Sequence, residues 1–109
     1  MHELSLTISL LELVAEEARG RRVQRVVVEI GKLSGVVPDA VRFAFDVCIK
    51  GTVAEGAALS IVETPGRGRC NVCGAESPLE SVIGTCPCGS VDLALVSGQE
   101  LRLRELEVL

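Results

Sequence analysis

Four of the five cysteines of this 109-residue chain lie between positions 70 and 88, and this cluster constrains the fold more than any other feature. Cys70 and Cys73 form one pair, followed by Gly74, and Cys86 and Cys88 form a second pair. Two thiolate pairs about a hairpin apart can surround one metal ion in the tetrahedral arrangement that structural zinc prefers. The spacing therefore predicts a small module with a closed, structural zinc site.

Other uses of four thiols remain open at this point. A thioredoxin-like redox pair would begin a helix, whereas Cys70 and Cys73 lie in a glycine-rich segment. Free thiols and an iron–sulfur cluster are also compatible with the count, but the paired spacing favours zinc. A catalytic zinc site would leave one coordination position open.

The second pair, Cys86-Pro87-Cys88, is one residue short of a standard knuckle, so we expect a tighter chelate ring with fewer amide-to-sulfur hydrogen bonds.

Helical and strand patterns occur on both sides of the cysteine cluster. The predicted elements are a helix over 4–18, a strand over 24–30, a helix over 38–50, a strand over 59–63 and, after the cluster, a strand over 99–109. Helices packed on one face of a small sheet are typical of the α+β class. Because strands flank the cluster, we expect residues 65–97 to form a zinc-ribbon-like module inserted into a domain made of residues 1–64 and 98–109.

The apolar positions of the helices predict which side chains are buried. In the first helix the main stripe is expected to consist of five residues at helical spacing, with Leu10 and Val14 beside it. These five are Leu4, Ile8, Leu11, Ala15 and Ala18. In the second helix the fifth cysteine, Cys48, shares the apolar stripe with Phe45. We therefore expect Cys48 to be a buried small hydrophobic residue rather than a metal ligand.

The last predicted strand contains a change of parity. Leu101 and Leu103 share one face, whereas Leu106 and Val108 fall on the opposite one. A β-bulge near Glu105 would return both pairs to the same face, and we predict such a bulge.

Composition and missing motifs exclude several classes of function. Eleven basic and fifteen acidic residues give a net charge of −4, whereas phosphate binding requires Lys and Arg, so no nucleic acid is expected as a partner. The chain has no Trp or Tyr to stack on bases.

No apolar run approaches the roughly 18 residues of a membrane helix, and no signal peptide is evident. We therefore expect a cytoplasmic protein in which thiols stay reduced. With one histidine and no phosphate-binding loop motif, we expect no enzymatic activity.

The first three residues offer a second metal site. The only histidine is His2, so the amino group of Met1 and the backbone and imidazole nitrogens of His2 can close fused chelate rings. Deprotonated amide nitrogens favour square-planar Ni(II) or Cu(II), and Glu3 can add a further donor. The alternative is a solvated helix start in which Glu3 interacts favourably with the helix dipole.

Taken together, these segments resemble the HypA/HybF family of hydrogenase nickel-incorporation proteins over the whole chain. The motifs that carry the resemblance are Met1-His2-Glu3, Val28-Glu29-Ile30-Gly31-Lys32-Leu33-Ser34, Val37-Pro38-Asp39, Phe43-Ala44-Phe45-Asp46, Gly56-Ala57-Ala58-Leu59, the cysteine module and Ser97-Gly98-Gln99-Glu100-Leu101. The resemblance implies two helices on a three-stranded sheet plus a zinc domain. It also implies a metallochaperone that works with a partner GTPase, HypB, to load nickel into the large-subunit precursor of [NiFe]-hydrogenase. Some members of the family also supply urease.

The resemblance also implies two sets of metal ligands. The Ni(II) cargo would be held by Met1, His2 and Glu3, and structural Zn(II) by Cys70, Cys73, Cys86 and Cys88. The departure from the family pattern is the shortened second cysteine pair. The alternative function is a zinc-ribbon protein-interaction module without nickel transfer. Because exposed edge strands or an exchanged zinc module allow self-association, we expect a monomer or a weak homodimer.

Overall fold

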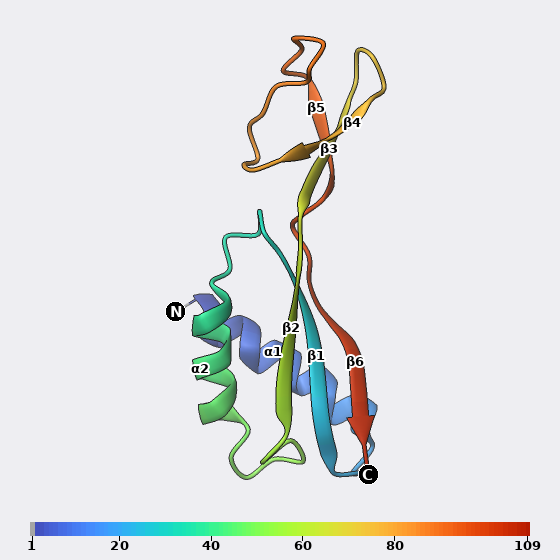
Figure 1. Cartoon of the computed structure of the whole chain (residues 1–109). Helices are drawn as coiled ribbons and strands as arrows, with labels where there is room; N and C mark the ends of the chain where they lie inside the picture. The colour runs from blue at the N-terminus through green and yellow to red at the C-terminus, as the bar shows by residue number, and fades with distance from the viewer. Residues whose placement is uncertain (1) are drawn as a thin grey trace.

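The computed structural model describes residues 2–109 and consists of two three-stranded sheets arranged along an elongated molecule of 53 × 25 × 17 Å. Helices α1 (His2–Ala18) and α2 (Pro38–Cys48) cover one face of the first sheet (Figure 1). That sheet contains β1 (Val23–Gly31), β2 (Ala58–Thr64) and β6 (Leu101–Val108). The second sheet contains β3 (Gly66–Cys70), β4 (Glu76–Leu79) and β5 (Leu93–Ser97). No helix within residues 2–109 is long and apolar enough to span a membrane.

The first sheet has the strand order β2-β1-β6, so β1 is its central strand. β1 runs parallel to β2 and antiparallel to β6. The run of β-branched residues in β1 suits this central position, because both faces of the strand are largely buried. The predicted α+β class is confirmed, with both helices packed on a small mixed sheet.

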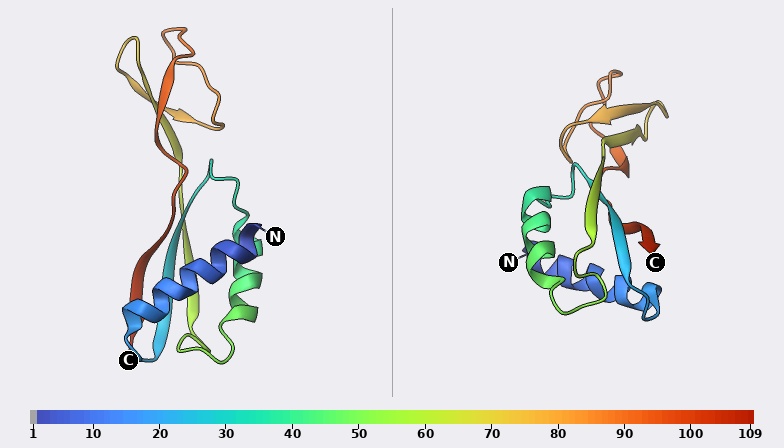
Figure 2. Two further views of the ribbon diagram at one scale, coloured as in Figure 1. Left: turned by 180° about the vertical axis from the view of Figure 1, so that it is seen from behind. Right: turned by 60° about the horizontal axis from the view of Figure 1, so that its bottom comes forward.

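Both helices bury their apolar residues against the same face of β1. Val14 of α1 and Phe45 of α2 belong to one hydrophobic cluster with Val28 of β1. α2 begins at Pro38, whose fixed φ and missing N–H suit the first turn. Seen from behind, α1 crosses the sheet diagonally, and the two helices meet near the N-terminus (Figure 2).

The prediction for the buried stripe of α1 was right for Ala18, which is buried, and for Leu11, which packs against the core, but wrong for its other members. Leu4 and Ile8 are exposed, as is Ala15, whereas Leu10 and Val14 are buried. α1 carries apolar residues around most of its circumference, so periodicity did not single out one face. Contact with α2 and β6 selected the face that is buried.

The predicted bulge in the last strand is confirmed. The pairing of β1 with β6 shifts between Val27, which faces Glu105, and Val28, which faces Leu103. One extra residue, Arg104, therefore lies between these two pairs. All four apolar side chains of β6 then pack on the helix side of the sheet, namely Leu101, Leu103, Leu106 and Val108.

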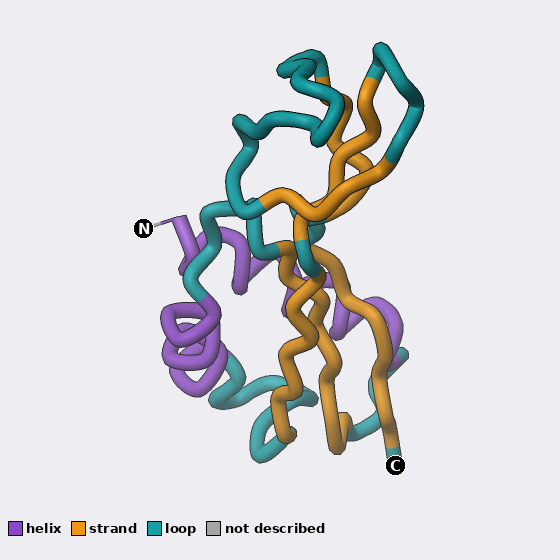
Figure 3. Tube along the Cα trace, turned by 45° about the horizontal axis from the view of Figure 1, so that its top comes forward, coloured by secondary structure: helices purple, strands orange, loops and turns teal. Residues whose placement is uncertain are grey.

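The second sheet has the order β4-β3-β5 and lies at the end of the molecule away from the helices. Long loops make up much of this end (Figure 3). Its central strand alternates glycine with arginine, and the glycines Gly66 and Gly68 are buried. Sequence reasoning predicted a module here but none of its strands, because a glycine leaves no apolar side chain to mark the buried face.

Glycines let the chain segments approach closely where the two sheets join. A Cβ added to Gly31 would lie 2.1 Å from the carbonyl oxygen of Gly98. Gly98 has a φ of 114° and lies against Gly66 on its other side. The backbone N–H of Leu33 donates to the Gly98 carbonyl at 2.6 Å. This junction places the cysteine-bearing sheet directly beyond the helix-covered one.

Candidate metal centres

The four clustered cysteines converge on one point. Their sulfur atoms all lie within 4.8 Å of one another. Cys70 Sγ lies 3.7 Å from Cys88 Sγ, and Cys73 Sγ lies 3.6 Å from Cys86 Sγ. A tetrahedral Zn–S₄ centre with bonds of about 2.3 Å has sulfur–sulfur edges of about 3.8 Å. A disulfide would need about 2.05 Å, so the spacing suits a shared metal ion and not covalent pairing.

Each cysteine pair sits on a tight turn next to the second sheet. Cys70 ends β3 and is followed by a turn closed by the Gly74 N–H on the Cys70 carbonyl. The second turn is closed by the Gly89 N–H on the Cys86 carbonyl at 2.8 Å. Both glycines have positive φ angles, 78° and 97°, which explains why a glycine follows each pair.

The two turns differ in their amide-to-sulfur hydrogen bonds. Cys70 Sγ accepts from the backbone N–H groups of Val72 and Cys73, at 3.3 and 3.4 Å. Cys86 Sγ accepts only from the N–H of Cys88, at 3.5 Å, in the part of the chain that the structure describes. Pro87 has no N–H to donate. The expectation of fewer such bonds at the shortened pair is confirmed.

The pKa values of the two buried thiols are shifted in opposite directions. The backbone N–H of Cys73 stabilises the thiolate of Cys70 and lowers its pKa to about 6. At Cys86 the N–H of Cys88 also favours the thiolate, but burial and the neighbouring thiols outweigh it and raise the pKa to about 12. Four thiols this close cannot all ionise without a cation among them. The donor set thus fits a thiophilic divalent ion such as zinc.

The predicted N-terminal site falls at the limit of what the structure describes. Met1 lies outside the described residues, and His2 opens α1 without a described side chain. Glu3 lies in the first turn of α1, and its Oε2 accepts from the backbone N–H of Val37 at 3.4 Å.

Cys48 and Glu29 are two further residues whose side chains carry reactive or charged groups. Cys48 is half-buried on α2, and it is not among the cysteines that gather in the metal-binding group. Sequence reasoning missed Glu29, which is buried in the middle of β1 and accepts hydrogen bonds from Thr64 and Arg102. A charged residue within an otherwise apolar strand was the signal that could have identified it.

Comparison with known proteins gives one family over the whole chain. Residues 1–108 match the HypA family, described as hydrogenase/urease nickel incorporation, metallochaperone. A hydrogenase maturation factor HypA from Nostoc punctiforme is 53% identical over 108 residues, which cover 99% of this chain and 96% of that protein. One from Geobacter metallireducens is 51% identical over 109 residues, covering 99% of each chain.

Solved structures agree with the sequence comparison. The solution structure of the Ni metallochaperone HypA from Helicobacter pylori matches with a TM-score of 0.72 and 29% identity, over 98% of this chain and 97% of that one. A second solution structure of a HypA protein matches with a TM-score of 0.75 and 32% identity, over 100% and 97% of the two chains. With its two helices on a mixed sheet and its four converging cysteines, this chain belongs to the HypA family of nickel metallochaperones for hydrogenase maturation.

Proposed function

We propose that this chain binds Ni(II) at its N-terminus and delivers it to the large-subunit precursor of a [NiFe]-hydrogenase, with a GTPase of the HypB type as partner. Membership of the HypA family is the observation that carries this proposal. The partner GTPase supplies nucleotide hydrolysis, because the chain itself has no phosphate-binding loop motif. Delivery to urease is an additional role within the same proposal, and both take place in the cytoplasm.

The four cysteines hold Zn(II) as a structural ion in this proposal. Their sulfur spacing of 3.6 and 3.7 Å and the two buried thiols support a closed site. A bound zinc supplies a fixed cross-link between the turn after β3 and the turn before β5. Residues 65–97 then form a zinc module, and residues 1–64 with 98–109 form the nickel-binding domain.

The nickel ligands are the Met1 amino group, the backbone and imidazole nitrogens of His2, and Glu3. His2 and Glu3 lie at the start of α1, and helix ends open locally at low free-energy cost, which supports a site that can release its ion. Acid protonates the amine, the amide and the imidazole, so nickel affinity falls as the pH is lowered. A metallochaperone needs this combination of specific binding and easy release.

Native mass spectrometry of the tag-free chain tests the two-site proposal. We expect one zinc ion in the purified protein and one further nickel ion after Ni(II) is added, with loss of protons. An N-terminal tag must be avoided, because it removes the amino-group donor. One zinc without specific nickel uptake would contradict the proposal and would favour a zinc-ribbon protein-interaction module.

A second measurement tests delivery. The nickel-loaded chain is mixed with a HypB-type GTPase and the hydrogenase precursor, and nickel on the precursor is measured with GTP and with a non-hydrolysable analogue. We expect transfer to be faster with GTP. The chain alone should not turn over GTP, and turnover by the purified chain would contradict its assignment as a non-enzyme.

A further inference from the structure

β6 is an edge strand with an unpaired side. In the first sheet it pairs with β1 and with no other strand of residues 2–109. It is eight residues long and follows the pattern Leu-Arg-Leu-Arg-Glu-Leu-Glu-Val. Long edge strands of this kind can pair with another chain unless something blocks them.

The side chains of β6 are complementary to those of a second, antiparallel β6. When two copies are related by a twofold axis between residues 104 and 105, every apolar residue faces an apolar one and every arginine faces a glutamate. The facing pairs are Leu101 with Val108, Arg102 with Glu107, Leu103 with Leu106 and Arg104 with Glu105. Opposite charges and apolar pairs directly across two strands stabilise their pairing. Arg102 and Glu107 already pair with Glu29 and Arg25 within the chain, so the charge complementarity rests on the two central pairs of Arg104 with Glu105.

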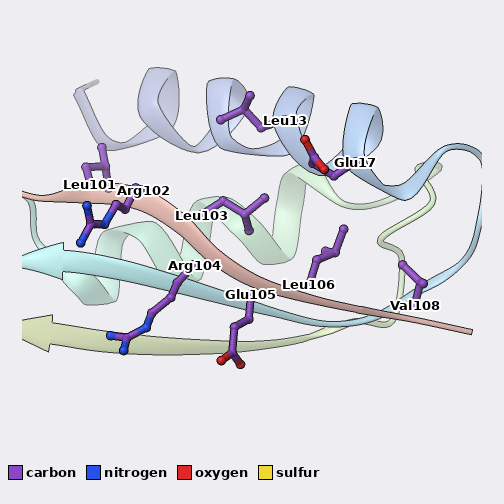
Figure 4. Close-up of a pocket in the computed structure, with 9 residues that line it drawn as sticks. All are labelled: Leu13, Glu17, Leu101, Arg102, Leu103, Arg104, Glu105, Leu106 and Val108. Carbon is purple, nitrogen blue, oxygen red and sulfur yellow. The ribbon is translucent and has the colours of Figure 1, made fainter.

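The bulge is essential to this complementarity. Because of the extra residue, both Arg104 and Glu105 point away from the helices, while Leu103 and Leu106 point toward them (Figure 4). A twofold axis perpendicular to the sheet keeps each face on its own side. The same bulge occurs in both copies, so the two strands have the same number of residues between their leucines and remain in register.

The backbone of β6 also presents its hydrogen-bonding groups at the required positions. The Gly31 N–H donates to the Glu100 carbonyl, and the Leu109 N–H donates to the Arg22 carbonyl. Residues 100 and 109 therefore face β1, and alternation on either side of the bulge fixes the remaining residues. The residues whose backbone groups face outward are Leu101, Leu103, Leu106 and Val108. These are the same residues that face one another across the twofold axis.

A groove runs along this edge and has room for the side chains of a second strand. Its volume is about 560 Å³, and Leu13 and Glu17 of α1 form one wall above the apolar side chains of β6 (Figure 4). Leu13 is 46% exposed, although it lies beside an apolar strand. Pairing of two β6 strands would bring further leucine and valine side chains to this groove and reduce the exposure of Leu13.

We propose that two copies of this chain associate through antiparallel pairing of their β6 strands, which joins the two helix-covered sheets into one six-stranded sheet. The occupant of the β6 edge is thus a second copy of the same chain. This inference is independent of the proposed nickel transfer, since it uses no metal ligand. The cysteine modules lie beyond the sheet and remain accessible in such a dimer.

The decisive experiment is a charge swap at the centre of the pairing. Arg104 and Glu105 belong to none of the salt bridges among residues 2–109, so exchanging them breaks no salt bridge of the single chain. We expect Arg104→Glu and Glu105→Arg each to weaken the dimer about tenfold or more, because each places two like-charged pairs at the twofold axis. The double variant R104E/E105R restores opposite charges and should recover the wild-type dimer constant.

Sedimentation velocity on the zinc-loaded, tag-free chain measures this effect at concentrations from about 10 μM to about 1 mM. Glu63→Arg, an exposed charge change on the strand at the opposite edge, is the matched control and should leave the dimer constant unchanged. A wild-type chain that stays monomeric up to the highest concentration overturns the proposal. So does a dimer that both single variants retain at full strength, which would point to an exchanged zinc module or another interface.

Discussion

Arg102 Nε on β6 donates a hydrogen bond to Oε1 of Glu29 on β1, at 2.7 Å. The Glu29 side chain is only 7% exposed, and the Thr64 hydroxyl from β2 donates to its other carboxylate oxygen. One carboxylate thus connects all three strands of the first sheet. Thr64 is also the last residue of β2 before the chain passes into the second sheet, so this contact holds the end of the sheet next to the cysteine module.

The first prediction concerns the stability that Glu29 provides. Glu29→Gln removes a charge-assisted acceptor, so we expect the Tm to fall by about 5 °C or more at pH 7. Thr64 and Arg102 lower the pKa of Glu29 from its ordinary value of 4.5. A carboxyl group with a lowered pKa stabilises the fold above its unfolded-state pKa, and this contribution is lost as the pH falls through the folded-state pKa.

The pH dependence of the difference between the two proteins provides the check. Calorimetry of the wild type and Glu29→Gln should give a constant Tm difference above about pH 5, which shrinks toward zero as the pH falls below 4.5. Both proteins lose thiolate-bound metal in acid, so the comparison cancels that effect. A Tm difference between the two proteins that stays the same from pH 7 to pH 3 would contradict the assigned role of the Glu29 charge.

The second prediction concerns the cysteine cluster. Cys73→Ser removes one of four converging donors, so we expect zinc to be lost and amide protection in β3, β4 and β5 to fall. Protection in β1 should remain, because the hydrophobic cluster of the first sheet contains no cysteine ligand. Metal analysis and hydrogen exchange measure the two effects.

Cys48→Ser is the matched control for this variant. Cys48 is half-buried on α2 and lies outside the cysteine group. The zinc content of the Cys48→Ser protein should therefore equal that of the wild type. If Cys73→Ser kept one tightly bound zinc, the ligand set would be wrong.

The third prediction concerns the junction of the two sheets. A methyl group at Gly31 would meet backbone atoms of Gly98 and Gln99 at 2.1 to 2.5 Å, and backbone cannot rotate out of the way as a side chain can. Gly31→Ala should therefore separate β1 from the segment before β6 and lower the free energy of unfolding in urea.

Gly35→Ala is the control for the junction. Gly35 has a φ of 77° with nothing within 4 Å of an added Cβ. Gly35→Ala should therefore lower the free energy of unfolding only by the cost of the left-handed conformation, about 1–2 kcal/mol. Gly31→Ala should lower the free energy of unfolding by clearly more than Gly35→Ala does. Equal costs for the two variants would mean that the close approach at Gly31 relaxes easily.

The degree to which the sequence predicts this structure differs from one region to the next. The bulge beside Glu105 could be predicted because the leucines change parity within a single strand. The convergence of the cysteines could be predicted because turn geometry and ligand chemistry are local properties. Both are cases in which a short segment carries the whole signal.

Features that depend on tertiary contacts could not be predicted in the same way. The buried face of α1 was predicted only in part because Ile8 and Val14 are similarly apolar, and only the position of α2 and β6 decides between them. Strand β3 was missed because Gly66 and Gly68 fill its buried positions, where neighbouring leucine side chains leave no space for a Cβ. The partners of Glu29 lie 35 and 73 residues away along the chain, so no local pattern indicates them.

The last prediction concerns the N-terminal metal site. His2→Ala removes the imidazole and breaks the fused chelate rings, so we expect tight nickel binding to be lost while zinc content and Tm stay at wild-type values. Placing two extra residues before Met1 should also abolish binding, because the terminal amine is displaced even though His2 is retained. Isothermal titration calorimetry with Ni(II) at several pH values measures both effects, and the wild-type affinity should weaken toward acid as protons compete for the nitrogen donors.

Loss of zinc from His2→Ala would show that the two metal sites are not separate. Unchanged nickel affinity in the extended chain would mean that the amino group of Met1 is not a ligand.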